Sequence, residues 1–373
     1  MNGFIVRVIS GVIAVAVWVA PAGAQRWKMQ YFYDKNKSTF LISDLQFASA
    51  SRGVAAGIIQ DGNHRKPTAV VTADGGEHWQ LVPLEEPPVS LFFLNENLGW
   101  MVTTKGLWRT QEAGKSWHHV AGLPAGMVRV YFQDENYGFA VGGKKKVLET
   151  HDGGKSWQPV PAAAQPPGMP EHSVYNWVAF ASPKVGLITG WNQPPRRTLK
   201  QFPDWMDPEA AMNQRELPHL SYELITTDGG KTWKPGSASL FGDVARVRFG
   251  KSGNGIGLIE YTNAFRYPSE AYRIDWTTGK SQTVYRDRRF AISDIWLTQD
   301  GVAYLAGILV PGQVRDVIPG KVQVLKSNDK DFSTWSEMDV DYRAVANRTT
   351  LAVVDANNMW LATNNGMILK LVP

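Results

Sequence analysis

The stretch Thr226-Thr227-Asp228-Gly229-Gly230-Lys231-Thr232-Trp233 decides the fold, because the chain repeats it. It recurs almost unchanged at two other places and in weaker form at two more: 72–79 and 150–157, then 110–117 and 327–335. The segment Thr363-Asn364-Asn365-Gly366 is interpreted as a truncated last copy. The copies are spaced by about 40 residues or about twice that distance, a period typical of propeller blades.

The chemistry of the repeated stretch indicates a turn. Its acidic side chain can accept hydrogen bonds from backbone N–H groups of the same turn, and the glycine pair permits positive φ angles. The tryptophan then begins the next strand and packs under the turn. A calcium loop would need six or more oxygen ligands, whereas each copy offers one carboxylate, so no metal or cofactor is expected. The acidic and tryptophan positions are Asp74 and Trp79, Glu112 and Trp117, Asp152 and Trp157, Asp228 and Trp233, and Asp329 and Trp335.

A second element precedes each turn: a strand of small and apolar residues opened by a glycine, such as Gly138-Phe139-Ala140-Val141-Gly142. Seven such strands predict an all-β fold, a seven-bladed propeller of four-stranded blades whose repeated turns join the third and fourth strands. The last blade has three strands of its own, expected at 342–348, 351–363 and 367–372. The alternating segment 27–33 is predicted to supply the fourth, so that both termini close the ring and remove open sheet edges.

Composition adds what the chain is not. Among 373 residues there is no cysteine, which excludes a disulfide framework, a thiol nucleophile and a lipid-modified cysteine. The 15 Trp and 35 Gly suit short strands and many turns. A net charge of +5 on so long a chain indicates no nucleic-acid partner.

The N-terminus, residues 1–24, is interpreted as an export signal. Arg7 precedes the apolar run Val8–Ala20, and Ala22-Gly23-Ala24 provides a small-x-small cleavage pattern. The alternative, a membrane anchor, requires about 20 apolar residues, which is more than this run offers. We therefore expect a periplasmic or otherwise exported protein with one domain, the propeller, over 25–373.

The repeated turns resemble Asp-box (BNR) repeats, and their arrangement resembles the photosystem II stability/assembly factor family of seven-bladed propellers. The resemblance covers residues 27–371. It implies a non-enzymatic chaperone-like role, binding a protein partner such as a subunit of a membrane complex, with membrane association only through that partner. In a photosynthetic source it implies the thylakoid lumen. We expect a monomer.

The face of the ring opposite the repeated turns is predicted to hold the partner. Its loops vary in length, and blade 4 carries an insertion at about 192–220 there. Positive charge gathers on the same face and suits an acidic segment, although acidic side chains share the face and would also fit a mixed solvated rim. The candidate binding residues are Lys144, Lys145, Lys146, Arg196, Arg197, Trp205, Arg266, Arg288, Arg289 and Arg315.

The rival class is a carbohydrate-active hydrolase of the sialidase type, because Asp-box repeats also occur in such enzymes. Phe265-Arg266-Tyr267-Pro268 resembles the arginine motif of sialidases but stands in the fifth blade rather than the first. Glycoside hydrolysis needs a pair of carboxylates, for which Glu260 and Glu270 are the candidates. No P-loop, nucleophile elbow or histidine spacing for a metal is present.

Overall fold

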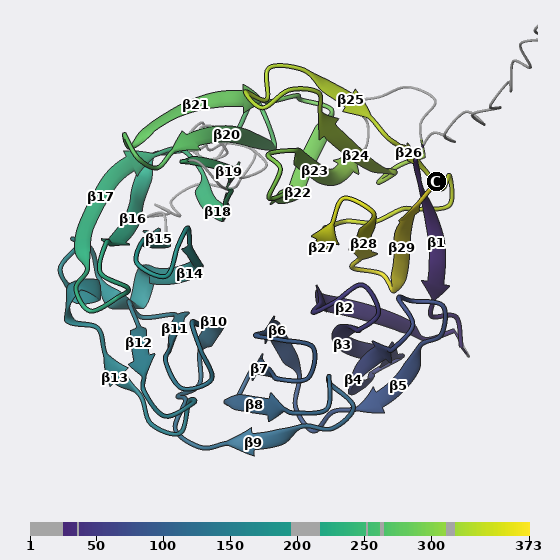
Figure 1. Cartoon of the computed structure of the whole chain (residues 1–373), viewed down its shortest axis with the longest axis horizontal. Coiled ribbons are helices and arrows are strands. Elements are labelled where there is room, and N and C mark those ends of the chain that lie inside the picture. Colours follow the sequence, from purple (N-terminus) through teal and green to yellow (C-terminus); the bar gives the residue numbers. More distant parts are fainter. Residues whose placement is uncertain (1–24, 36, 195–216, 251–252, 262–264, 311–317) are drawn as a thin grey trace, which may run out of the picture.

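The chain is described by a computed structural model that covers residues 25–35, 37–194, 217–250, 253–261, 265–310 and 318–373. The signal and most of the blade 4 insertion therefore lie outside the described residues. Seven sheets stand like blades around one central axis (Figure 1). In the described part no helix is long and apolar enough to cross a membrane. The predicted all-β propeller with four-stranded blades is confirmed.

Blades 1 to 3 follow one another along the chain, each with its strands in sequence order from the axis outward. Blade 1 contains β2 (Thr39–Phe47), β3 (Gly53–Asp61), β4 (His64–Thr72) and β5 (Gln80–Pro83). Blade 2 contains β6 (Pro88–Phe93), β7 (Gly99–Thr103), β8 (Leu107–Thr110) and β9 (His118–Val120). Blade 3 contains β10 (Met127–Phe132), β11 (Gly138–Gly142), β12 (Val147–Thr150) and β13 (Gln158–Pro159).

Blades 4 to 6 repeat this order. After two short 3₁₀ helices, η1 (Pro161–Ala164) and η2 (Pro170–His172), blade 4 contains β14 (Ser173–Phe180), β15 (Gly186–Asn192), β16 (His219–Thr226) and β17 (Lys234–Leu240). Blade 5 contains β18 (Asp243–Phe249), β19 (Asn254–Glu260), β20 (Ser269–Asp275) and β21 (Lys280–Tyr285). Blade 6 contains β22 (Phe290–Leu297), β23 (Ala303–Leu309), β24 (Val322–Ser327) and β25 (Trp335–Glu337).

Blade 7 closes the ring with both ends of the chain. Its inner strands are β27 (Thr349–Asp355), β28 (Asn358–Thr363) and β29 (Met367–Val372), and its outer strand is β1 (Arg26–Phe32), antiparallel to β29. The short β26 (Asp339–Val340) adds a parallel pairing to β1. Closure by the N-terminal segment is thus confirmed, and Trp27 on β1 is 1% exposed.

The expected membership of blade 7 is wrong in one respect. Residues 342–348 form no strand; the innermost strand is β27, and a tight turn separates it from β28. The Asp355 carboxylate explains the turn, because it accepts hydrogen bonds from the backbone N–H groups of Asn357 and Asn358 at 2.8 and 3.0 Å. An aspartate that holds its own turn separates two strands within a short stretch.

The glycine that opens the second strand of four blades has a packing reason. An aromatic side chain from the end of the first strand lies against it, as Phe93 lies against Gly99. A Cβ atom at Gly99 would stand 2.6 Å from the Phe93 ring, and Phe47, Phe132 and Phe180 face their glycines in the same way. The glycine therefore lets two adjacent strands pack one aromatic ring between them.

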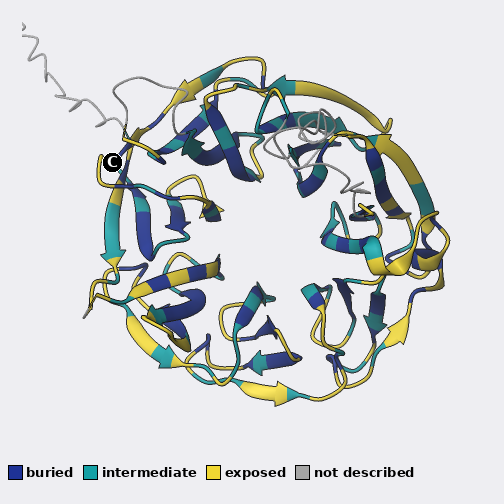
Figure 2. Cartoon of the chain, turned by 180° about the vertical axis from the view of Figure 1, so that it is seen from behind, coloured by how far each residue is buried: buried dark blue, intermediate teal, exposed yellow. Residues whose placement is uncertain are grey.

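The ring has two different faces. The turns between first and second strands, and between third and fourth strands, form one face, which we call the Asp-box face. The connections between second and third strands, and from one blade to the next, form the loop face. Within the blades, the outermost strands are the most exposed and the inner strands are buried (Figure 2).

The repeated turns hold themselves together by side-chain hydrogen bonds. In blade 3 the Thr150 hydroxyl donates to the Asp152 carboxylate at 2.8 Å and accepts from the Gly154 N–H at 2.9 Å. The same carboxylate accepts from the Ser156 N–H at 2.9 Å. Blades 1 and 4 repeat these contacts, and the glycine pair takes positive φ angles, 75° and 94° for Gly153 and Gly154. The turn is a closed hydrogen-bonded unit.

These turns also join neighbouring elements. The Gly153 N–H donates to the carbonyl of Asn136 in the first turn of its own blade, and the Trp100 indole of blade 2 donates to the Gly153 carbonyl at 3.3 Å. Across the closure, the Trp360 indole donates to the Gly75 carbonyl at 3.0 Å. The truncated copy at 363–366 is wrong: it joins β28 to β29 on the loop face, because the position of the true turn is occupied by the chain ends.

Candidate functional site

A cavity of about 650 Å³ opens at the centre of the ring toward the Asp-box face. Its wall is made by the ends of the innermost strands, which all run toward that face, and by first turns such as Thr298–Asp300. We call it the channel-mouth site. A volume of this size lies in the range of ligand-binding sites and accommodates several side chains of a bound segment.

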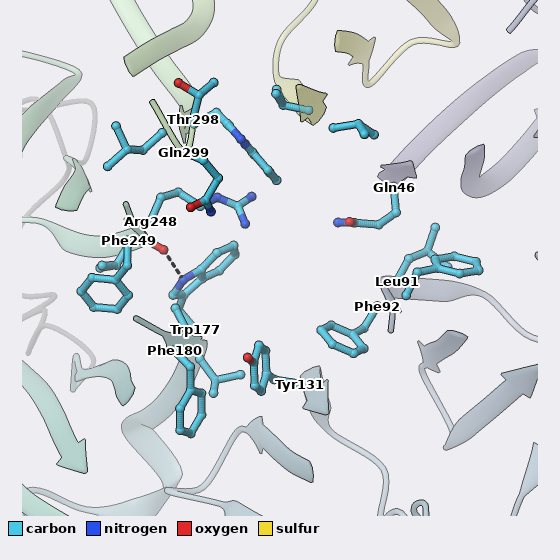
Figure 3. Close-up of a pocket in the computed structure, with 18 of the residues that line it drawn as sticks. Gln46, Leu91, Phe92, Tyr131, Trp177, Phe180, Arg248, Phe249, Thr298 and Gln299 are labelled. Carbon is cyan, nitrogen blue, oxygen red and sulfur yellow. Dashed lines mark hydrogen bonds between the residues drawn. The ribbon is translucent and has the colours of Figure 1, made fainter. Parts of the chain in front are cut away.

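Trp177, on the innermost strand of blade 4, is the centre of the site. Its indole N–H donates to the Val247 carbonyl at 2.8 Å, which fixes the ring against blade 5 (Figure 3). Three guanidinium groups lie within reach of its ring centroid: Arg129 at 4.3 Å, Arg246 at 4.8 Å and Arg248 at 4.9 Å. Arg248 also lies 4.1 Å from the ring centroid of Trp296. Cation–π contacts of this kind hold the positive charges in place without neutralising them.

Two buried aspartates share the wall with these arginines. Asp44 on β2 and Asp294 on β22 are 5% and 2% exposed. Each accepts a backbone N–H from the neighbouring blade, Leu91 at 2.9 Å and Leu351 at 2.8 Å, so each bridges two innermost strands. Asp294 also lies 3.7 Å from the Arg246 guanidinium. Three arginines against two aspartates, both engaged by backbone, leave the wall with an excess of positive charge.

The electrostatics of the wall follow from burial. Burial lowers the pKa of Arg129 to about 10; the Asp44 charge opposes this shift, and the charges of Arg246 and Arg248 add to it. Burial likewise lowers the pKa of Arg248 and raises that of Asp44. At neutral pH the arginines stay protonated and repel one another, so an added carboxylate would relieve that repulsion.

Aromatic side chains surround the positive charge. Phe92, Tyr131, Phe180 and Phe249 line the cavity from blades 2 to 5, with Gln46 and Gln299 at its edge (Figure 3). Tyr131 and Phe180 stack with ring centroids 4.9 Å apart. A site with apolar walls and a few positive groups suits an acidic, partly apolar segment of polypeptide.

Sequence reasoning missed this site. It searched the loop face, whereas the arginines stand on the innermost strands. A signal was present: Arg246 and Arg248 alternate with Val247 and Phe249 on a strand predicted to line the axis. Alternation places both arginines on the same side of the strand, toward the channel.

The predicted binding residues on the loop face fall into groups. Arg196, Arg197, Trp205 and Arg315 lie outside the described residues. Lys144 is exposed, while the Lys145 ammonium donates to the Pro166 carbonyl and lies 5.4 Å from the Tyr222 ring centroid. Lys146 is half-buried beside them.

The arginines of blade 5 and its exit loop divide in two. Arg289 forms an ion pair with Asp287 at 3.0 Å. Arg266 and Arg288 converge instead on the ring of Tyr267, at 5.5 and 6.0 Å from its centroid. The structure thus brings two of the predicted residues together around a tyrosine.

The carboxylate pair considered for hydrolysis does not assemble. Glu270 is the cross-strand partner of Ile259, so Glu270 and Glu260 point to opposite faces of blade 5. Glu260 forms an ion pair with Arg348, and Glu270 accepts hydrogen bonds from Tyr261 at 3.0 Å and from Thr283. Two carboxylates on opposite faces of a sheet cannot flank one glycosidic bond. In the described part of the chain, no group of three or more His, Asp or Glu side chains could hold a metal.

Comparison with known proteins agrees with the repeat and the fold. The BNR/Asp-box repeat model matches residues 224–235. Vacuolar protein sorting/targeting protein 10 of Verticillium alfalfae is 26% identical over 104 residues, which are 26% of this chain and 7% of that protein. The chain therefore spans only a small part of that relative's length.

These findings define the chain as an Asp-box seven-bladed propeller. Among solved structures it is similar to YCF48, the photosystem II assembly factor, in a structure described as YCF48 bound to D1 peptide: the TM-score is 0.60, with 16% identity, covering 92% of this chain and 99% of that one. YCF48 from Cyanidioschyzon merolae gives a TM-score of 0.58 with 13% identity, covering 93% and 98%. The expected resemblance is confirmed as a likeness of fold.

Proposed function

We propose that this protein is a non-enzymatic, exported propeller that binds a protein partner and acts as an assembly or accessory factor for a membrane complex. The observation that carries the proposal is the channel-mouth site, in which three arginines converge on Trp177 within an aromatic wall. The solved likeness to a propeller bound to a peptide supports a peptide ligand.

The chemistry of the site indicates which segment it takes. Carboxylates would pair with Arg129, Arg246 and Arg248 by charge-assisted hydrogen bonds, while apolar side chains would lie against Phe92 and Phe249. An extended acidic segment meets both demands, since it enters the cavity without bringing a folded domain inside. The rigid ring requires little ordering on binding, which lowers the entropic cost.

Site-specific photo-crosslinking tests the proposal. A photoreactive residue at Gln299, at the cavity edge, is expected to capture a partner in extracts of the source organism, and the same residue at the exposed Tyr342 of the loop face is the control. The captured segment, made as a peptide, should bind the purified protein by calorimetry. The variant R129Q/R248Q should weaken that binding by about tenfold or more, the loss of at least one charge-assisted contact.

Two outcomes would contradict the proposal. One is capture only at Tyr342, which would place the partner on the loop face. The other is a captured segment whose peptide binds R129Q/R248Q as tightly as the unchanged protein. Equal melting temperatures for both proteins show that the variant is folded.

A further inference from the structure

A second cluster of positive charge lies on the loop face, remote from the channel mouth. Three guanidinium groups surround the ring of Tyr267: Arg286 at 5.1 Å, Arg266 at 5.5 Å and Arg288 at 6.0 Å from its centroid. Arg266 and Tyr267 belong to the β19–β20 connection, and the other two belong to the β21–β22 connection. We call these four residues the Tyr267 cluster. Two loops from different edges of blade 5 thus contribute to it.

The arginines of this cluster have no anionic partner within the described residues. All three are exposed, and the acidic side chains nearby are already engaged. Asp287, which stands between Arg286 and Arg288 in sequence, pairs with Arg289, and Glu260 pairs with Arg348. Local neutralisation elsewhere leaves the Tyr267 cluster with three uncompensated charges.

The form of the neutral pairs shows what a carboxylate requires on this face. Arg289 binds both oxygens of Asp287, at 3.3 and 3.0 Å, and Arg343 binds both oxygens of Asp341, at 2.9 and 2.6 Å. One guanidinium thus satisfies one carboxylate. Three guanidinium groups around one ring suit an anion with three or more oxygens and up to two charges, which is the chemistry of a phosphate ester.

An exposed aromatic stack lies beside the cluster in sequence and on the same face. Phe265 stacks on Tyr261 with centroids 4.2 Å apart and on Phe241 at 5.7 Å. Phe241 is 45% exposed, which is unusual for a phenylalanine. An apolar group next to phosphate-binding arginines fits a ligand whose phosphate is attached to an apolar body, as in a phospholipid.

We propose that the Tyr267 cluster is a binding site for a phosphate ester, either the headgroup of an anionic phospholipid or a soluble phosphate compound. The site is separate from the channel mouth and does not depend on the function proposed for it. Sequence alone provided no reason to expect direct contact with a membrane, because the two loops meet only in the folded blade.

Two probes distinguish the sources. Flotation with vesicles of phosphatidylcholine, with and without phosphatidylglycerol, measures the lipid source, and calorimetry with inorganic phosphate and glycerol 3-phosphate measures the soluble one. The variant R266Q/R286Q/R288Q should lose binding by tenfold or more in whichever arm the unchanged protein binds. The matched control K115Q/K155Q/K231Q removes the same charge from exposed positions on the Asp-box face and should retain binding.

Phe241→Ser separates insertion from charge recognition. Loss of vesicle binding with unchanged phosphate binding assigns a phospholipid, whereas no effect in either arm assigns a soluble phosphate ester. The proposal is overturned if the unchanged protein binds neither probe, if both triple variants lose binding equally, or if a poly-glutamate peptide binds the cluster in preference to phosphate. Unchanged melting temperatures confirm that the variants are folded.

Discussion

The two faces of the ring follow different rules. On the Asp-box face, short repeated turns are hydrogen-bonded to their own blade and to the next one, as the Gly75 carbonyl is to the Trp360 indole. On the loop face, connections differ from blade to blade, and the contacts are local pairs such as Arg343 with Asp341. The comparison teaches that one face is preorganised around the channel mouth, while the other carries charge on exposed side chains.

The sharpest test of this difference is a pair of aromatic substitutions. Trp360→Ala should lower the free energy of unfolding by about 3–5 kcal/mol, the usual cost of removing a buried tryptophan. Trp360 is fully buried, and its ring is stacked on Phe47 with centroids 3.5 Å apart. Tyr342→Ala on the loop face, where the side chain is 72% exposed, should change stability by no more than about 0.5 kcal/mol. Urea denaturation measures both, and similar losses would erase the distinction.

A second test exchanges the two positive sites. R129Q/R248Q should weaken binding of the acidic peptide by about 10- to 100-fold, since one or two charge-assisted contacts are lost. The same variant should leave phosphate binding unchanged, and R266Q/R286Q/R288Q should behave in the opposite way. Calorimetry with both probes on both variants checks this, and a variant that weakens both ligands would show that the two faces are coupled.

A third test uses acid. Hydrogen bonds in the turns, first from Ser156 and Thr232, lower the pKa values of Asp152 and Asp228 to about 2. The unfolded carboxyl has a pKa of about 3.9 and binds its proton more tightly, so this stabilisation is complete above that pH and is lost as pH falls toward 2. The melting temperature should therefore decline between about pH 4 and pH 2, and D152N/D228N should flatten that decline.

The control for acid is Asp61, an exposed carboxylate of the loop face. D61N should leave the profile of melting temperature against pH as it is. A profile that D152N/D228N does not alter would mean that the Asp-box carboxylates contribute nothing through their charge.

The smallest expected effect concerns the ion pairs of the loop face. R289Q and R343Q break exposed pairs with Asp287 and Asp341, and exposed pairs of this kind contribute little to stability. Neither variant should shift the melting temperature measurably. A clear loss in either would show that the loop face is as tightly organised as the Asp-box face.

Much of the architecture could be predicted because its signals are local. The Asp-box turn lies within eight consecutive residues, and the glycine that opens the second strand stands a few residues after its aromatic partner. Ring closure followed from a blade one strand short and an alternating N-terminal segment. The error at 363–366 has the same origin: a local motif does not tell which face of the ring its turn occupies.

The functional surfaces were harder to predict because they are not local. Arg129, Trp177 and Arg248 belong to three blades, and only closure of the ring brings their side chains onto one channel wall. The Tyr267 cluster needs two loops of blade 5 to meet, and the pairing of Asp287 with Arg289 decides which arginines stay uncompensated. Such choices depend on distance in space and on competition between charges.

The amino-acid sequence by itself determined the repeat, the number of blades and the strand that closes them, because turn chemistry and strand alternation act between near neighbours. Only the tertiary structure decided where positive charge is concentrated and where it is cancelled. The physical reason is that an ion pair or a cation–π contact depends on separations of a few ångströms, and the ring sets those separations between residues far apart in the chain.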